Sequence, residues 1–80
     1  MKAGVTLKDL TPREREVLTL VAKGLSSAEA GHALQIDERS VDDHVVNINA
    51  KLETKNRQQL VHAAYYLGLI VFTAKGVFSR

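Results

Sequence analysis

The sequence predicts an all-α fold, a bundle of four helices in which strands are absent. Two observations lead to this prediction: apolar residues recur at helical spacing, and most of the apolar runs begin with a capping signal. The 80 residues allow one domain with a small core. With 45% hydrophobic and 25% charged residues, the composition is that of a globular domain and excludes a disordered or fibrous chain.

The first helix is predicted from a capping box. Thr11 stands before a proline, and Glu14 occupies the third helical position, where its side chain can reach back to the cap. The helix should run from about Pro12 to Lys23 and end at Gly24. Its apolar stripe consists of Val17, Leu18, Leu20 and Val21.

The second helix repeats the same device, with Ser26 as the cap and Glu29 reaching back. It should last about two turns and end near residues 33–34. The next helix then begins at Asp37 or at Ser40, which leaves only a few residues for the turn. Two helices joined by so short a turn must cross steeply.

The third and fourth helices follow from apolar spacing and one further cap. One buried face is predicted for the third helix, at Val41, Val45, Ile48 and Leu52. Asn56 can cap a fourth helix that has Gln59 at its third position and ends at Gly68. Its apolar positions are Leu60, Ala63, Ala64 and Leu67.

The net charge of +2 is unevenly distributed along the chain. Residues 1–37 are neutral, with five basic and five acidic side chains, and residues 38–53 carry −2, with two bases against four acids. From Thr54 onward there are four basic residues and no acid: Lys55, Arg57, Lys75 and Arg80. The positive charge therefore lies beside the third helix and mostly not on it.

Several classes of protein have no support in the sequence. It contains no cysteine, the longest apolar run (67–72) is too short to span a membrane, and no signal peptide opens the chain. We therefore expect a cytoplasmic protein without membrane contact. The three histidines have no metal-like spacing, and neither a nucleophile elbow nor a glycine-rich phosphate loop is present. We expect no metal, no cofactor and no enzymatic activity.

A short helix, a tight turn and a longer helix with a polar outer face form a helix-turn-helix. Beyond this arrangement, residues 10–70 resemble the LuxR-type (GerE or FixJ type) helix-turn-helix domain of bacterial transcription regulators. The resemblance rests on "LTPREREVL" at 10–18, on "G" and "S" at Gly24 and Ser26, on "SV..HV.NI..KL" at 40–52 and on "LGLI" at 67–70. It divides the chain into an N-terminal arm (1–9), the domain (10–70) and a C-terminal tail (71–80).

The resemblance implies a transcriptional regulator that binds duplex DNA, is associated with the bacterial nucleoid and inserts its third helix, about residues 38–53, into the major groove. It assigns base-facing positions to Asp42, Asp43, Val46 and Asn47. It assigns phosphate contacts to Ser26, Ser27, Ser40, Lys51, Lys55 and Arg57. Members of the family commonly carry lysine or arginine where this chain has Asp42 or Val46, so neither position offers a cation here.

The two aspartates allow several interpretations. Their carboxylates can accept from a cytosine amino group, form ion pairs within the protein or between subunits, or disfavour DNA. They can also stabilise the start of the helix through its dipole. The competing hypothesis is a protein interaction module that has lost base reading because of Asp42 and Asp43, and that acts as an antagonist or partner of a related regulator.

A second surface is expected on the fourth helix. In the family this helix pairs two domains, which implies a homodimer contact through Val61, Tyr65 and Gly68. The alternative is that Val61 and Tyr65 only widen the core stripe of a short helix. The tail has no counterpart in the family motif, and its apolar residues can fold back over the bundle, extend the dimer contact or fray: Phe72, Val77 and Phe78.

Overall fold

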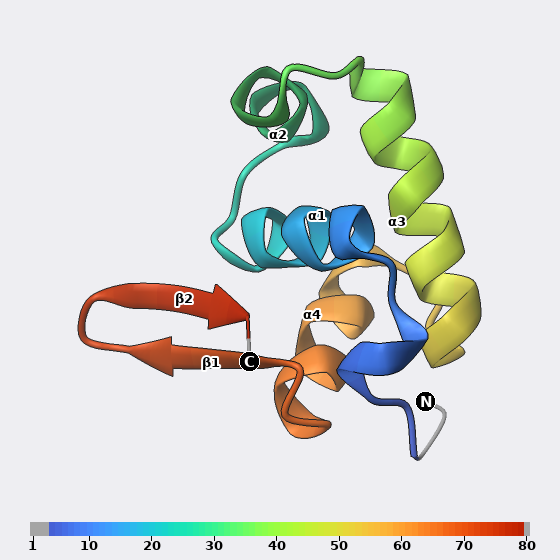
Figure 1. Ribbon diagram of the computed structural model, residues 1–80, viewed down its shortest axis with the longest axis vertical. Coiled ribbons are helices and arrows are strands. Elements are labelled where there is room, and N and C mark those ends of the chain that lie inside the picture. The colour runs from blue at the N-terminus through green and yellow to red at the C-terminus, as the bar shows by residue number, and fades with distance from the viewer. Residues whose placement is uncertain (1–3, 80) are drawn as a thin grey trace.

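The computed structural model describes residues 4–79 and is mostly helical (Figure 1). A short 3-10 turn, η1 (Leu7–Asp9), precedes four helices and a two-stranded sheet. The helices are α1 (Pro12–Ala22), α2 (Ser27–Leu34), α3 (Glu38–Leu52) and α4 (Arg57–Tyr66), and the strands are β1 (Ile70–Thr73) and β2 (Gly76–Ser79). The predicted fold class and its four helices are confirmed. Residues 1–3 of the predicted arm and Arg80 of the tail lie outside the described residues.

The predicted caps of α1, α2 and α4 are present, whereas Asp37 precedes α3 without a capping bond from its side chain. The Thr11 hydroxyl accepts from the Glu14 backbone N–H at 3.1 Å, and the Glu14 carboxylate accepts from the Thr11 backbone N–H at 2.8 Å. Ser26 and Glu29 form the same reciprocal pair at the start of α2. Asn56 caps α4 by accepting from the backbone N–H of Gln59 at 2.8 Å. These bonds satisfy backbone donors that have no partner inside the helix.

The helix ends differ from the prediction by about one residue. α1 ends at Ala22, with Lys23 as its C-cap, and α3 begins after Asp37 and not after Ser40. Two ends are closed by non-glycine residues in the left-handed region, where glycine is usual: Gln35 with φ 59° and Glu53 with φ 56°. The first closes the turn between α2 and α3, and the second closes the turn between α3 and α4.

The hydrophobic core lies where α1, α3 and α4 meet (Figure 1). α3 contributes its whole predicted stripe, Val41, Val45, Ile48 and Leu52. α1 and α4 contribute Val17, Leu18, Val21, Leu60, Ala63 and Ala64. Val5 from the start of the described chain and Val77 from its end are buried in the same core. No described helix has the length and apolar character that crossing a bilayer requires.

The expectation that strands are absent was wrong. β1 and β2 pair antiparallel, with Ile70 opposite Ser79 and Thr73 opposite Gly76. The Thr73 hydroxyl accepts from the Lys75 backbone N–H and donates to the Gly76 carbonyl, which closes the turn. β-branched and aromatic residues on both sides of a glycine are the signal for such a hairpin. In a tail with no strict alternation this signal was too short to be recognised.

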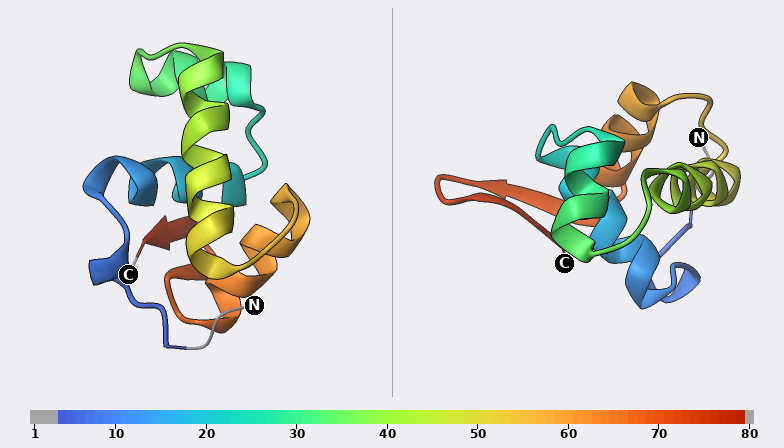
Figure 2. Two further views of the ribbon diagram at one scale, coloured as in Figure 1. Left: turned by 90° about the vertical axis from the view of Figure 1, so that its right-hand side faces the viewer. Right: turned by 90° about the horizontal axis from the view of Figure 1, so that it is seen from above.

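The hairpin packs on α1 through β2 and on α4 through β1. It projects away from the bundle on the side opposite α3, as the front view and the view from above both show (Figures 1 and 2). Of the alternatives for the tail, folding back over the bundle is confirmed for Val77, whereas Phe78 is 45% exposed. The side chain of Phe72 is outside the described part of the structure.

Candidate nucleic-acid interface

α3 has one buried face and one exposed face. Its apolar stripe packs against α1, α2 and α4, and the opposite side faces solvent (Figure 2). The four side chains that were predicted to face bases, Asp42, Asp43, Val46 and Asn47, are all exposed. Val46 stands out because it is an aliphatic side chain that remains 64% exposed. The amphipathic pattern of α3 thus leaves a continuous free surface on a rigid helix of 15 residues.

Three of the predicted site residues come together where α2 begins. The Ser27 hydroxyl donates to Oδ1 of Asp42 at 2.5 Å and accepts from Nη2 of Arg57 at 2.5 Å. Nη1 of the same guanidinium donates to the Leu25 carbonyl at 2.9 Å. Ser27 is only 7% exposed, so its hydroxyl is enclosed by these partners. Asp42 is therefore linked through Ser27 to a cation, but among the described residues it forms no direct ion pair of the kind that was one interpretation of its role.

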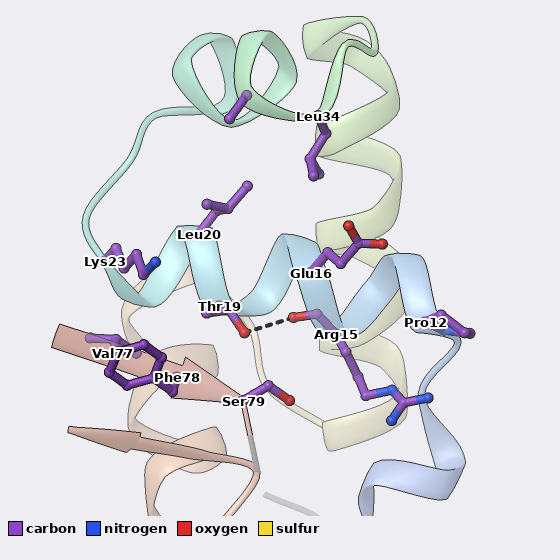
Figure 3. A pocket seen from close by; sticks show the side chains of 11 residues that line it. Pro12, Arg15, Glu16, Thr19, Leu20, Lys23, Leu34, Val77, Phe78 and Ser79 are labelled. Carbon is purple, nitrogen blue, oxygen red and sulfur yellow. Dashed lines mark hydrogen bonds between the residues drawn. The ribbon is translucent and has the colours of Figure 1, made fainter. Parts of the chain in front are cut away.

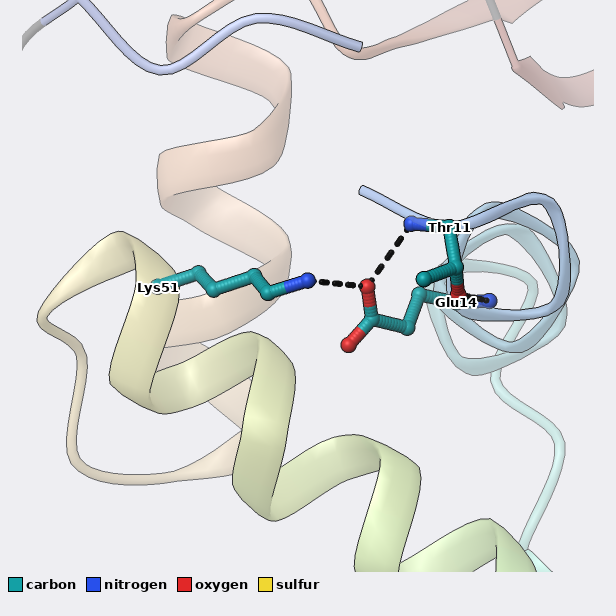
Figure 4. Close-up of polar contacts among 3 residues, drawn as sticks. All are labelled: Thr11, Glu14 and Lys51. Carbon is teal, nitrogen blue, oxygen red and sulfur yellow. Dashed lines mark hydrogen bonds and ion pairs between the residues drawn. The ribbon is translucent and has the colours of Figure 1, made fainter. Parts of the chain in front are cut away.

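Lys51, by contrast, points towards the start of α1. Its Nζ donates to Oε1 of Glu14 at 2.6 Å, and the same oxygen accepts from the backbone N–H of Thr11 (Figure 4). Glu14 is 4% exposed. Burial by itself would raise the pKa of the Glu14 carboxyl, but the Lys51 ammonium and the Thr11 donors outweigh it and lower that pKa below its ordinary value. A residue predicted to hold phosphate is thus an ion-pair partner in the free domain.

The other predicted phosphate contacts are more accessible. The Ser26 hydroxyl accepts from the Glu29 backbone N–H, which leaves its proton available to a ligand. Ser40 is half-buried in the first turn of α3, and Lys55 is exposed between α3 and α4. A bond of 2.6 Å from the Thr54 hydroxyl to the Asn49 side chain holds the turn that presents Lys55. Ser26, Ser40 and Lys55 therefore offer polar groups that internal bonds leave at least partly free.

The predicted dimer surface is a shallow hollow between the end of α1 and α4. The hollow has a volume of about 580 Å³ and includes Val61 and Tyr65 in its lining. Val61 is half-buried against the core, whereas Tyr65 is 56% exposed. Gly68 is half-buried with φ 75° and ends the helix. Leu60 and Ala64 on the neighbouring face are fully buried, as expected.

A second pocket, of about 510 Å³, was not expected from the sequence (Figure 3). It lies between α1, the end of α2 and β2, and its lining includes Arg15, Leu20, Leu34 and Phe78. Lys23 places its Nζ 5.9 Å from the centre of the Phe78 ring. One wall of the pocket is strand β2 of the hairpin. The pocket could not be predicted because the hairpin itself was not expected.

The short helix α2, the turn at residues 35–37 and the longer helix α3 define the class of the protein as a helix-turn-helix domain. Comparison with known proteins identifies the family. The model described as "Bacterial regulatory proteins, luxR family" matches residues 8–64. The chain therefore belongs to this family, which consists of DNA-binding transcription regulators and not of enzymes, and it is a LuxR-type DNA-binding domain.

Individual relatives agree with this assignment. The transcriptional activator protein SolR of Ralstonia nicotianae is 46% identical over 61 residues, which are 76% of this chain and 26% of SolR. The response regulator protein VraR of Staphylococcus aureus is 46% identical over 61 residues, which are 76% of this chain and 29% of VraR. A solved structure of the transcription factor GerE superposes with a TM-score of 0.69 at 34% identity, covering 74% of this chain and 88% of that one. The chain thus spans less than a third of the length of SolR or VraR.

Proposed function

We propose that this domain binds duplex DNA with the exposed face of α3 in the major groove. The observation that supports this most strongly is the free face of α3, which carries Asp43, Val46 and Asn47 without covering elements. Asn47 offers the amide pair that suits adenine, Val46 an apolar contact for a thymine methyl, and Asp43 an acceptor for a cytosine amino group. These three side chains would supply discrimination between sequences.

The phosphate contacts in this proposal come from the two ends of α3. Lys55 and Ser26 are exposed and retain donors. Arg57 follows Lys55 by two residues and bonds to the carbonyl of Leu25, the residue before Ser26. Ser40 lies in the first turn of α3. Such contacts supply affinity without regard to sequence and make binding dependent on salt. Lys51 can join them only by leaving Glu14. The proposal therefore predicts modest affinity that decreases steeply with salt.

Lys55 gives the test of this surface, and Lys75 gives its matched control. Both lysines are exposed and sit in turns, but Lys75 lies in the hairpin turn, on the side of the bundle opposite α3. Lys55→Ala should weaken binding to specific and random duplexes alike and reduce the salt slope by about one, while Lys75→Ala should change neither. Fluorescence anisotropy at several salt concentrations measures both quantities. Equal effects of the two substitutions would show that only net charge matters and would count against this surface.

We further propose that two copies associate through α4, with Val61 and Tyr65 at the contact and Gly68 at its end. The hollow between α1 and α4 supports this, because an apolar and aromatic surface beside a groove suits a two-fold contact. A dimer would place two α3 helices on a two-fold DNA site.

Specific observations favour the alternative hypothesis, that the domain is a protein interaction module. Asp43 is exposed on the face of α3 that is proposed to meet DNA, and Lys51 and the Ser27 hydroxyl are already bonded inside the protein. If wild type binds neither random nor genomic DNA at low salt, this hypothesis is preferred. The expected partner is then a related regulator, which pull-down with α4 variants would test.

A further inference from the structure

Asp42, Ser27 and Arg57 form a chain of hydrogen bonds that joins α3, α2 and α4. A serine hydroxyl has one proton, and in this structure it is donated to Oδ1 of Asp42. The guanidinium of Arg57 directs Nη2 at the same hydroxyl. The resemblance to LuxR-type domains assigns both of these residues, Ser27 and Arg57, to contacts with DNA phosphate. A carboxylate is therefore bound where a phosphate oxygen would be expected.

We propose that Asp42 is an internal competitor for DNA phosphate and that it lowers the affinity of the domain for DNA of any sequence. This inference rests on the proposed function, because it concerns how strongly the same surface binds. The carboxylate and the phosphate are both anions that accept charge-assisted hydrogen bonds from hydroxyl and guanidinium donors. While Asp42 holds the Ser27 proton, the hydroxyl cannot donate to DNA. The contacts to bases then account for a larger share of the total affinity.

The two donors would remain in position if the carboxylate were removed. Nη1 of Arg57 is held by the Leu25 carbonyl at 2.9 Å, a bond that does not involve Asp42. Ser27 lies in the first turn of α2, which is capped by Ser26 and Glu29. Replacing Asp42 by alanine therefore frees the Ser27 hydroxyl proton, while Nη2 of Arg57 still donates to the oxygen of that hydroxyl.

Asp43 supplies a matched control within the same helix. It carries the same charge, it is exposed like Asp42, and within residues 4–79 no hydrogen bond or ion pair involves its side chain. Removing Asp43 takes away one negative charge from the DNA-facing side without breaking an internal bond, and with DNA of random sequence its proposed contact to cytosine contributes little. Any additional effect at Asp42 then belongs to its bond with Ser27.

A double-mutant cycle tests the proposal with a duplex of random sequence. Asp43→Ala should raise affinity about two- to threefold through charge alone, whereas Asp42→Ala should raise it about tenfold because it also frees the Ser27 hydroxyl proton beside the Arg57 guanidinium. In a Ser27→Ala background the gain from Asp42→Ala should fall to that of Asp43→Ala. Asp42→Asn, which keeps an acceptor for the hydroxyl, should match Asp43→Asn. Melting curves of each variant show that the fold is retained.

The outcomes separate this inference from the function on which it depends. If wild type binds DNA and Asp42→Ala raises affinity equally with and without Ser27, Asp42 acts only through its charge and the proposal is overturned. A wild type that fails to bind, together with a Ser27-dependent gain of binding in Asp42→Ala, supports it strongly. If neither wild type nor Asp42→Ala binds any duplex, both the proposed function and this inference fail.

Discussion

Removing the ammonium of Lys51 should destabilise the domain through Glu14. The Glu14 carboxylate is nearly buried, and its acceptor oxygen is shared by Lys51 and the Thr11 backbone N–H. Lys51→Met keeps most of the aliphatic length of the side chain but deletes the donor. The carboxylate then remains in a site that water reaches poorly, with one of its charge-assisted bonds lost.

The magnitude follows from the burial of the two partners. A hydrogen bond to a charged group contributes about 1.5–3 kcal/mol, and breaking a fully buried ion pair costs about 3–5 kcal/mol. The Lys51 side chain is 37% exposed and the Thr11 bond persists, so the lower range applies. We expect Lys51→Met to lower the free energy of unfolding by about 1.5–2.5 kcal/mol and the melting temperature by roughly 10 °C.

The loss should depend on pH with a defined sign. The pKa of Glu14 in the folded domain lies below its ordinary value of 4.5, so its contribution to stability is present above 4.5 and is lost as pH falls through the folded pKa. Without Lys51 that pKa rises, because burial is opposed by fewer donors. The difference in unfolding free energy between wild type and Lys51→Met should therefore be largest near pH 7 and shrink below about pH 4.5.

Urea denaturation followed by circular dichroism, at a series of pH values, measures this difference. Glu14→Gln provides the background control, since glutamine still accepts from Thr11 but carries no charge. In that background Lys51→Met should cost less than about 0.5 kcal/mol, because the buried charge that Lys51 pairs with is gone and its aliphatic part is retained. A loss that is independent of pH, or one that persists in the Glu14→Gln background, would refute the argument from the ion pair.

Other substitutions test the turn, the hairpin and the dimer surface. Gln35→Gly should stabilise the domain by about 0.5–1 kcal/mol in urea denaturation, because Gln35 closes α2 with φ 59°, a conformation that glycine adopts without strain. Val77→Ala should cost about 1–2 kcal/mol in the same assay, whereas Phe78→Ala, at a position 45% exposed, should cost less than half as much. Val61→Glu and Tyr65→Glu should each shift sedimentation towards the monomer at unchanged helical circular dichroism, and unfolding of both variants would place these residues in the core and count against the dimer.

The helices could be predicted because their signals are local. The capping boxes of Thr11 and Ser26 lie within four residues of chain, and the stripe of α3 repeats at helical spacing, so each was recognisable from the sequence and confirmed in the structure. The sequence did not distinguish between Asp37 and Ser40 as the residue at which α3 begins. The Asp37 side chain makes no capping bond, so the residue type alone does not reveal which polar residue precedes the first turn.

The contacts of the candidate site could not be predicted, because they join residues that are distant in sequence. The bond from Arg57 to Ser27 spans 30 positions, the bond from Ser27 to Asp42 spans 15, and the pair of Lys51 and Glu14 spans 37. The resemblance to the family assigned Ser27, Asp42, Lys51 and Arg57 to DNA contacts and said nothing of their mutual distances. Only the packing of α1, α2, α3 and α4 decides which of these side chains meet.

The position of β2 has a consequence for how the chain reaches its folded state. Val77 is buried against a core that α1 begins to form more than fifty residues earlier in the chain. Contacts between such distant segments require closure of a long loop, which is entropically costly and favours late formation. During synthesis the four helices can form in order, but α1 stays open on its hairpin side until Val77 has been added and released. β2, the last described strand, therefore governs when the interior becomes closed to water.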